Sequence, residues 1–303
     1  MDILSDKPDT STWQVSDLSA PGLNVERGLS LLPQNNNLYT SCFACLMQAD
    51  PFVKADMVVA LYNRLPSLEP DADIAVPERI ETPGIPERPR LVDPRKVSKR
   101  GFGSDAGRTS LLHALAHIEF NAINLATDAA YRFRGMPDDF AASWLLVAAE
   151  ESVHFLLVAE RLRQLDTFYG AFDAHAGLWN MALKTDHDVM VRMALVPRVL
   201  EARGLDVAPP MIAKFRQRED HDSADILQRI FNDEIRHVQI GNHWFRHCCA
   251  ERNLKPSEVF AQLLRQHSRG YLRGPYNADA RVQAGFSLDE LDALREIEAE
   301  WSD

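Results

Sequence analysis

Two short segments, far apart in the chain, repeat one pattern: a glutamate followed three residues later by a histidine. They are Glu151-Ser-Val-His154 and Glu234-Ile-Arg-His237. In an α-helix this spacing turns the chain by about 300°, so the carboxylate and the imidazole project from one stripe, roughly one turn apart. One such pair is usually a solvated surface pair. Two of them, each inside a long helical stretch, indicate a metal site between helices.

Long helical periodicity begins at Ser104 and continues with few helix-breaking residues. It predicts helices at residues 104–134, 138–166, 178–203 and 220–253, with residues 210–217 as a candidate extension at the front of the last helix. Strand signals are nearly absent, so the predicted class is all-α.

Two residues are expected to shape the third predicted helix. Pro197 predicts a kink about one turn before Glu201. Gly204 occupies the position that a helix C-terminus prefers, so we expect the helix to stop there.

Each Glu-x-x-His pair is matched by a lone glutamate on the preceding helix. Glu119 precedes the first pair and Glu201 precedes the second. Four helices that contribute two lone glutamates and two Glu-x-x-His pairs supply the six ligands of a ferritin-like two-metal carboxylate centre. The predicted architecture is therefore a ferritin-like antiparallel four-helix bundle.

The spacing of these residues tests this prediction. In an antiparallel helical hairpin, residues at equal height have numbers that sum to twice the turn centre. Glu119 and Glu151 place the first centre at residue 135, inside the predicted turn Gly135-Met-Pro137. Glu201 and Glu234 place the second centre at 217 or 218. If the third helix stops at Gly204, however, the connection to the fourth helix is not centred at these residues. The second agreement is looser, so Glu201 is the weakest of the six assignments.

The bundle is predicted to have an extension on each side. Residues 1–100 are expected to form an N-terminal arm, a helical stretch from about Leu38 to Leu65 interrupted near Pro51, and a proline-rich strap. Residues 101–255 form the bundle. Residues 256–303 form a C-terminal extension, with a covering loop at 270–286 and a final helix opened by the capping-box pattern Ser287-Leu-Asp-Glu290.

Composition excludes several classes of function. The formal net charge of −11 argues against non-specific binding to a nucleic-acid backbone. The chain lacks an apolar run of the ~18 residues that span a bilayer, and its polar start lacks the apolar core of a signal peptide. We therefore expect a cytoplasmic protein without a membrane partner. Cys42-Phe-Ala-Cys45 matches a CxxC motif, but its surroundings favour packed, reduced thiols over a zinc or redox site.

Charge compensation strengthens the metal prediction. Four carboxylates buried together would cost several kcal/mol each unless they were compensated. Two divalent cations would balance four glutamates and two neutral imidazoles. This oxygen-rich ligand set with two nitrogens suits iron, or manganese, better than zinc.

Other polar residues near these positions have competing interpretations. Glu150 competes with Glu151 as a ligand, but only Glu151 has a histidine three residues later. Histidine ligands usually bind a further partner, for which the candidates are Asp128, Asp233 and Asn124. The remaining side chains are interpreted mainly as packed or hydrogen-bonded residues, with a redox role left open for the two tyrosines: His113, His117, His243, His247, Tyr131 and Tyr169.

Several runs carry a family resemblance. They include Ala116-His-Ile-Glu-Phe-Asn121, Ala148-Ala-Glu-Glu-Ser-Val-His154, residues 193–206, and Asp233-Glu-Ile-Arg-His-Val-Gln-Ile-Gly-Asn-His, with flanking runs at residues 90–97 and 274–281. In these runs the chain resembles the DUF455 group of ferritin-like proteins. The resemblance implies a ferritin-like bundle with these residues at the metal positions: Glu119, Glu151, His154, Glu201, Glu234 and His237. It implies no substrate, and a similarity to tRNA hydroxylases of the same superfamily is more distant.

The leading functional hypothesis is a di-iron oxidase or oxygenase that uses dioxygen to oxidise an unidentified small molecule. The alternatives are an iron-handling ferroxidase and a non-catalytic bundle that the metal only stabilises. Nucleic acid is not the expected partner, although a modified tRNA stays open, as does a homodimer.

Overall fold

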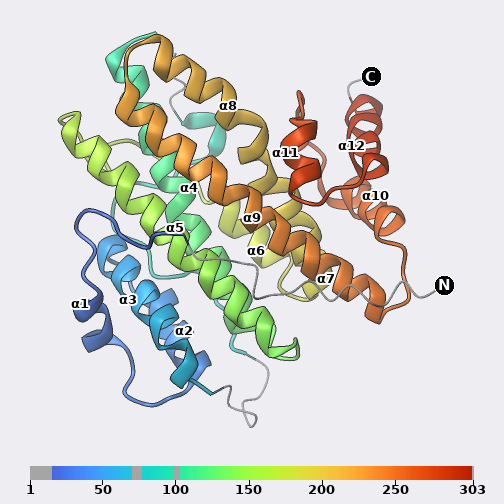
Figure 1. Cartoon of the computed structure of the whole chain (residues 1–303), viewed down its shortest axis with the longest axis horizontal. Coiled ribbons are helices and arrows are strands. Elements are labelled where there is room, and N and C mark those ends of the chain that lie inside the picture. Colours follow the sequence, from blue (N-terminus) through green and yellow to red (C-terminus); the bar gives the residue numbers. More distant parts are fainter. Residues whose placement is uncertain (1–15, 70–76, 98–102, 302–303) are drawn as a thin grey trace.

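The computed structural model describes residues 16–69, 77–97 and 103–301. Within these ranges the chain is helical and forms no strand, only isolated bridges between Asn37 and Glu69 and between Leu91 and Ala174. Figure 1 shows long helices side by side in the centre, with shorter helices at both ends of the colour range packed around them. The predicted all-α class is confirmed.

Two helical hairpins form the centre. The first joins α4 (Asp105–Arg132) to α5 (Asp138–Gln164), and the second joins α8 (Ala202–Gln217) to α9 (His221–Glu251). The turn between α4 and α5 lies at residues 133–137, as the spacing of Glu119 and Glu151 predicted. Helix α5 also packs along α9, for example through a hydrogen bond of 2.9 Å from the Trp244 indole to the Ser143 hydroxyl.

The third predicted helix is divided into four segments. They are α6 (Gly177–Lys184), α7 (Val189–Leu195), a π-helical turn η4 (Val196–Glu201) and α8. Asp188 starts α7 as its N-cap, because its carboxylate accepts the backbone N–H groups of Met190 and Val191. The irregularity expected at Pro197 takes the form of this π turn, in which Pro197 supplies no backbone N–H.

The expectation that Gly204 ends a helix is wrong, since α8 continues to Gln217 through Pro209 and Pro210. Pro209 cannot donate to the carbonyl of Leu205, four residues earlier. The Asn277 side chain donates to that carbonyl instead, at 3.1 Å. The C-terminal extension thus satisfies a group that the proline leaves open, and α8 persists.

The greater length of α8 also explains why the turn centre required by Glu201 and Glu234 did not match the predicted helix ends. The connection between α8 and α9 is residues 218–220, close to the centre at 217 or 218 that Glu201 and Glu234 require. The mismatch came from ending the helix at Gly204.

Three N-terminal helices cover the first hairpin: α1 (Val25–Leu31), α2 (Leu38–Met47) and α3 (Pro51–Arg64). The predicted interruption near Pro51 is the break between α2 and α3, where Asp50 caps α3 and Pro51 occupies its first turn. The sequence did not predict α1. Two short 3₁₀ turns follow, η2 (Leu65–Ser67) and η3 (Pro94–Lys96).

The described part of the proline-rich strap, residues 77–97, is fastened to α2 and α3. The Gly84 N–H donates to the Leu46 carbonyl at 2.8 Å. A Cβ at Gly84 would lie 2.3 Å from the Met47 carbonyl oxygen, so only glycine fits this approach. The buried Lys54 ammonium donates to the carbonyls of Leu46 and Gly84 and to the Asn124 amide oxygen of α4.

The C-terminal extension contains α10 (Pro256–His267), α11 (Ala278–Gln283) and α12 (Leu288–Glu300). The capping box at Ser287 and Glu290 is confirmed. Helices α10 and α11 were not predicted from the sequence. Arg281 on α11 forms a buried ion pair of 2.8 Å with Asp206 on α8, so the extension holds the helix that follows Glu201.

One helix contains an apolar stretch that the sequence was not expected to have. By length and composition alone α5 could span a membrane, but 89% of its most apolar window is buried inside the structure. Burial of this kind is expected for the core helix of a soluble protein.

Candidate metal centre

Glu151 lies between the two motif histidines. One of its carboxylate oxygens is 3.3 Å from Nδ1 of His154, and the other is 2.9 Å from Nδ1 of His237. The two imidazole rings have centroids 5.7 Å apart. All three side chains are fully buried. Glu151 is therefore positioned to bridge two sites, each with one imidazole nitrogen.

Two further glutamates complete these sites, one on each side. A Glu119 oxygen is 3.6 Å from Nδ1 of His154, and a Glu234 oxygen is 3.9 Å from Nδ1 of His237. One ligand atom from each of Glu119, Glu151, His154 and Glu234 can be chosen so that all four lie within 4.8 Å of one another, which is close enough for a shared cation.

Glu201, the last residue of the π turn, lines the same cavity as Glu119 and Glu234. A π turn holds one residue more than an α turn, so it rotates the residues after it by about 100° relative to a continuous α-helix. The direction of Glu201 therefore depends on the irregularity at Pro197. Helix α9 packs tightly here, because a Cβ at Gly241 would lie 2.3 Å from Cβ of Pro197. The structure thus brings all six predicted residues into one cluster.

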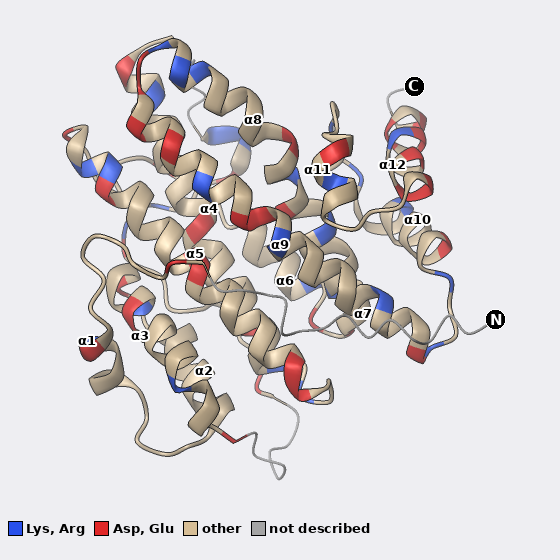
Figure 2. Ribbon diagram, viewed as in Figure 1, with Lys and Arg blue, Asp and Glu red and all other residues tan. Residues whose placement is uncertain are grey.

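Several carboxylate oxygens in the cluster are buried without a hydrogen bond. Among the described residues, no hydrogen-bond partner exists for Oε2 of Glu119, Oε2 of Glu234 or either oxygen of Glu201. The carboxylate of Glu201 is buried although part of the residue remains accessible. Buried polar atoms are rarely left in this state without an ion or water. Figure 2 shows acidic residues near the middle of α5 and near the middle of α9.

A cross-brace between α5 and α9 holds the far nitrogen of each histidine. His154 Nε2 is 3.0 Å from an Asp233 oxygen, and His237 Nε2 is 2.8 Å from a Glu150 oxygen. Each acidic residue directly precedes the glutamate of the opposite motif. Both Nδ1 atoms are thereby turned toward the cluster, a common arrangement around metal-binding histidines.

Half of this cross-brace was predicted from the sequence. Asp233 was one of the predicted histidine partners. The other two predictions are wrong, because Asp128 pairs with Arg132 and Arg192, and Asn124 accepts from Lys54. Glu150 was considered only as a rival ligand. Each motif glutamate is directly preceded by an acidic residue, and this repeated feature could have identified Glu150 as a histidine partner.

A second layer of contacts ties the cross-brace to the N-terminal arm. The Arg236 guanidinium donates to both Glu150 and Asp233. The Ser16 hydroxyl donates to Asp233 at 2.5 Å, and the Ser16 backbone N–H donates to Glu150 at 3.0 Å. Neither Arg236 nor Ser16 was predicted from the sequence. They hold the two braces together from the side away from the cluster.

Burial perturbs the titration of the whole cluster. Desolvation, with repulsion from Glu151, raises the pKa values of Glu119 and Glu201 to about 8 each. The pKa of Glu234 is also raised, for the same reasons. The pKa of Glu151 is lowered, because its contacts with the two protonated imidazoles outweigh the opposing effect of burial.

The histidines and their braces shift in a complementary way. Despite burial, the surrounding carboxylates raise the pKa values of His154 and His237 well above normal. Burial opposes ionisation of Asp233, but its contact with His154 lowers its pKa to about 2. Without a cation, the cluster stays neutral enough to be buried by holding protons on three glutamates and both histidines.

A cavity of about 130 Å³ adjoins the cluster, between α4, α8 and α9, with Leu178 of α6 in its wall. The three carboxylates that line it are Glu119, Glu201 and Glu234. These are the three that carry unpartnered oxygens. The cluster is therefore open toward this cavity.

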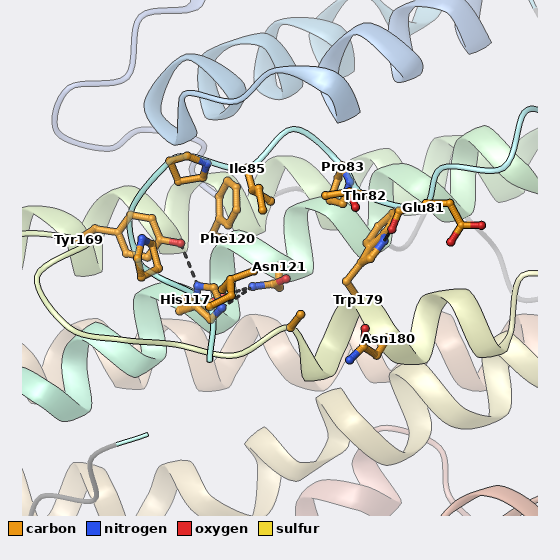
Figure 3. Close-up of a pocket in the computed structure, with 14 residues that line it drawn as sticks. Glu81, Thr82, Pro83, Ile85, His117, Phe120, Asn121, Tyr169, Trp179 and Asn180 are labelled. Atoms are coloured by element: carbon orange, nitrogen blue, oxygen red, sulfur yellow. Dashed lines mark hydrogen bonds between the residues drawn. The ribbon is translucent and has the colours of Figure 1, made fainter. Parts of the chain in front are cut away.

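A second cavity, of about 280 Å³, lies between the strap, α4 and α6 (Figure 3). His117 borders it, and its Nδ1 is 2.9 Å from the Tyr169 hydroxyl. His113 accepts the Gly170 N–H, so both histidines are hydrogen-bonded as interpreted. Burial raises the pKa of Tyr169, which packs against Phe155.

The remaining residues of interest have ordinary packing roles. The Tyr131 ring lies against Phe43 and under the Arg134 guanidinium. His243 and His247 flank the Trp244 ring. All four cysteines lie in the described ranges, where they are buried and free, including the pair of the CxxC motif.

Fold and site together define an all-helical protein with a buried cluster of four glutamates and two histidines. Comparison with known sequences gives its family: the chain belongs to DUF455, described as a protein of unknown function, which matches residues 47–292. A protein of Haemophilus influenzae described as uncharacterized is 47% identical over 264 residues, which cover 84% of this chain and 92% of the relative. No solved structure matches the chain.

Proposed function

We propose that the cluster holds two metal ions, iron or manganese, and that the protein is an oxidase or oxygenase that activates dioxygen. The arrangement we propose is ferritin-like, with α4 and the η4–α8 segment each contributing one glutamate and α5 and α9 each contributing a Glu-x-x-His pair. We place this activity in the cytoplasm, consistent with four free cysteines.

The observation that carries the proposal is the set of unpartnered carboxylate oxygens. Four buried oxygens, on Glu119, Glu201 and Glu234, face the cluster without a hydrogen bond from the described residues. An unsatisfied buried polar group costs about 1–3 kcal/mol, and more when it is charged. A fold that only needed packing would have apolar residues here. Two divalent cations would satisfy these oxygens and balance the four glutamates.

The donor set fits such ions. Glu151 would bridge the two, since its oxygens face different histidines. Nδ1 of His154 and of His237 would each bind one ion, while Nε2 stays occupied by Asp233 or Glu150. The donors are mostly oxygen with two nitrogens, which favours iron or manganese over zinc.

A pair of iron ions with open coordination positions supplies the ability to bind and reduce dioxygen. The protein's own residues supply the setting. Glu119, Glu201 and Glu234 line the adjoining cavity, so a molecule in that cavity would lie next to these three carboxylates. Their raised pKa values mean that metal binding displaces protons. The cross-brace keeps both imidazoles oriented through this change.

The proposal is tested by anaerobic titration of the chain with Fe(II), followed by exposure to oxygen. We expect two ions per chain, consumption of dioxygen, and no further iron uptake. Glu151→Gln should abolish binding of the pair because it removes the bridging charge. The control is Glu160→Gln on the same helix, which changes a carboxylate hydrogen-bonded to exposed Arg163 and should bind like the wild type.

The other hypotheses give different results in the same experiment. Continued uptake of many ions per chain would favour iron storage. Stoichiometric metal that does not react with oxygen would leave a structural role. Binding that Glu151→Gln does not change would overturn the assignment of the site itself.

A further inference from the structure

We propose that the cavity beside Glu119, Glu201 and Glu234 binds an aliphatic group of about five or six carbons, comparable to the ligands that apolar protein cavities of similar size admit. The inference that this group belongs to the substrate of the centre rests on the proposed function. The binding of the group itself does not.

The position of the cavity connects it to the cluster. Its wall includes three of the four glutamates, and each of the three has a buried oxygen without a hydrogen-bond partner in the described part of the chain. A group inside the cavity would therefore lie next to these oxygens. It would approach the centre from the side opposite the cross-brace.

The chemistry of the wall determines what fits. Apart from the glutamates and Arg203, the lining side chains are apolar, including Leu115, Leu125, Leu178, Val207, Leu227 and Phe231. Among these described lining residues, none offers a hydroxyl, amide or imidazole. Away from the three carboxylates, a sugar, nucleotide or amino-acid group would lose its hydrogen bonds with water and gain none from the apolar wall, at a cost of about 1–3 kcal/mol for each polar group. An aliphatic group loses nothing of this kind.

Arg203 does not turn the cavity into an anion site. Its guanidinium donates to the Arg273 carbonyl at 2.5 Å and lies 3.6 Å from the Asp206 carboxylate. Its side chain is 35% exposed, so water and the Asp206 carboxylate, which also pairs with Arg281, together stabilise its charge. The second cavity differs in kind, because aromatic rings and side-chain amides line it (Figure 3).

The size of the cavity limits the group. Its volume of about 130 Å³ is near the ~150 Å³ of an engineered apolar cavity that admits benzene. Ile118 lines it and is 47% exposed, so an apolar edge reaches the protein surface. A larger molecule could place an aliphatic end inside while the rest stays outside.

Two small residues of α8 keep this space open. Ala208 is buried and lines the cavity. Gly204 also lines it, and a Cβ there would lie 3.9 Å from Cγ and Cδ of Glu234, an ordinary contact. A larger side chain at either position would occupy space in the cavity.

The test uses the full chain and straight-chain 1-alkanols from propanol to octanol, measured by calorimetry with chelated protein and with Mn(II)-loaded protein. Each added methylene should tighten binding about fourfold, up to about six carbons, after which the gain should stop. In the Mn(II)-loaded protein, paramagnetic relaxation should be strongest for the methyl protons of the alkanol, because the aliphatic end lies inside the cavity.

Matched variants locate the binding. Ala208→Leu should weaken hexanol binding at least about tenfold, because three added carbons occupy the space. Ala213→Leu is the control, since Ala213 lies on the same helix, is exposed and does not line the cavity. If Ala208→Leu fails to fold, Gly204→Ala should still fold and should shorten the preferred alkanol by about one carbon.

Four results would count against the inference or against the proposed function on which part of it rests, and they are distinguishable. Absence of hexanol binding with normal Mn(II) binding overturns it and leaves the cavity as a passage for small molecules such as dioxygen. If the affinity rises uniformly up to octanol, or if Ala213→Leu weakens hexanol binding as much as Ala208→Leu does, the alkanol does not bind in this cavity. Normal hexanol binding without any Mn(II) binding overturns the proposed function, and with it the assignment of the group as substrate.

Discussion

Replacing Glu201 with glutamine should change how the metal-free protein responds to pH. The pKa of Glu201 is raised to about 8 by burial and by repulsion from Glu151, against an ordinary value of 4.5. The folded chain therefore holds a proton that the unfolded chain releases above pH 4.5. Because the folded state binds more protons, its stability falls as pH rises from about 4.5 to about 8 and is level above that.

The size of this effect can be worked out from the shift. The pKa of Glu201 is about 3.5 units higher in the fold than its ordinary value. At about pH 7 the group is still protonated in the fold but ionised in the unfolded chain, so roughly 2.5 of these 3.5 units contribute to the change in the free energy of unfolding. At about 1.4 kcal/mol per unit this is roughly 3.5 kcal/mol lost relative to acid conditions, of which about 2–3 kcal/mol is lost between about pH 5 and pH 7. Glutamine has nearly the same shape and does not titrate, so Glu201→Gln should lack this loss.

The assay is urea unfolding of chelated wild type, Glu201→Gln and the control Glu296→Gln, an exposed carboxylate on α12. The free energy of unfolding should fall more steeply with pH for the wild type and the control than for Glu201→Gln. The Mn(II)-loaded wild type should show the opposite trend, because metal binding requires ionised carboxylates and strengthens as pH rises. Parallel pH profiles for all three chelated proteins would refute the reasoning.

Three further predictions concern the cross-brace and the packing around it. Asp233→Asn should weaken Mn(II) binding roughly 10–100-fold in a metal titration, because it loosens the imidazole on the facing helix, and unchanged affinity would rule out the brace. Glu290→Ala should lower the unfolding free energy by about 3–5 kcal/mol in urea, since it leaves the buried Arg198 guanidinium without its carboxylate. Gly241→Ala should cost about 1–3 kcal/mol and shift the melting temperature down, because its Cβ meets Pro197 at 2.3 Å, and a neutral effect would show that the two helices can separate freely.

The long helices could be predicted because their sequence patterns are local. Apolar periodicity, the Ser104 cap and the Gly135 turn define α4 and α5 within a few residues. Helix α8 could not be predicted in the same way. Gly204 and two consecutive prolines are local signals for an end, and the contact that overrides them comes from Asn277, over seventy residues later. A local signal for a helix end fails where a distant side chain donates a hydrogen bond to the backbone carbonyl that a proline cannot reach.

The candidate site shows the same division. The six clustered residues follow from helical spacing and from the charge balance of buried carboxylates. The contacts of Ser16 with Glu150 and Asp233 depend on where the N-terminal arm crosses the bundle, and no spacing rule states this. The cavity was also inaccessible to prediction, because its walls come from four helices whose distances depend on packing.

The cross-brace has a consequence for how the bundle reaches one structure. Each motif supplies an acid that holds the histidine of the other, so neither α5 nor α9 can satisfy its own histidine alone. A slip of one helical turn, about 5.4 Å, would separate both pairs at once and remove from each buried imidazole the carboxylate that holds its Nε2. Apolar side chains of similar size along α5 and α9 would tolerate such a slip far better. We infer that the polar residues fix the register of this helix pair, and that the register in turn aligns the two lone glutamates with Glu151.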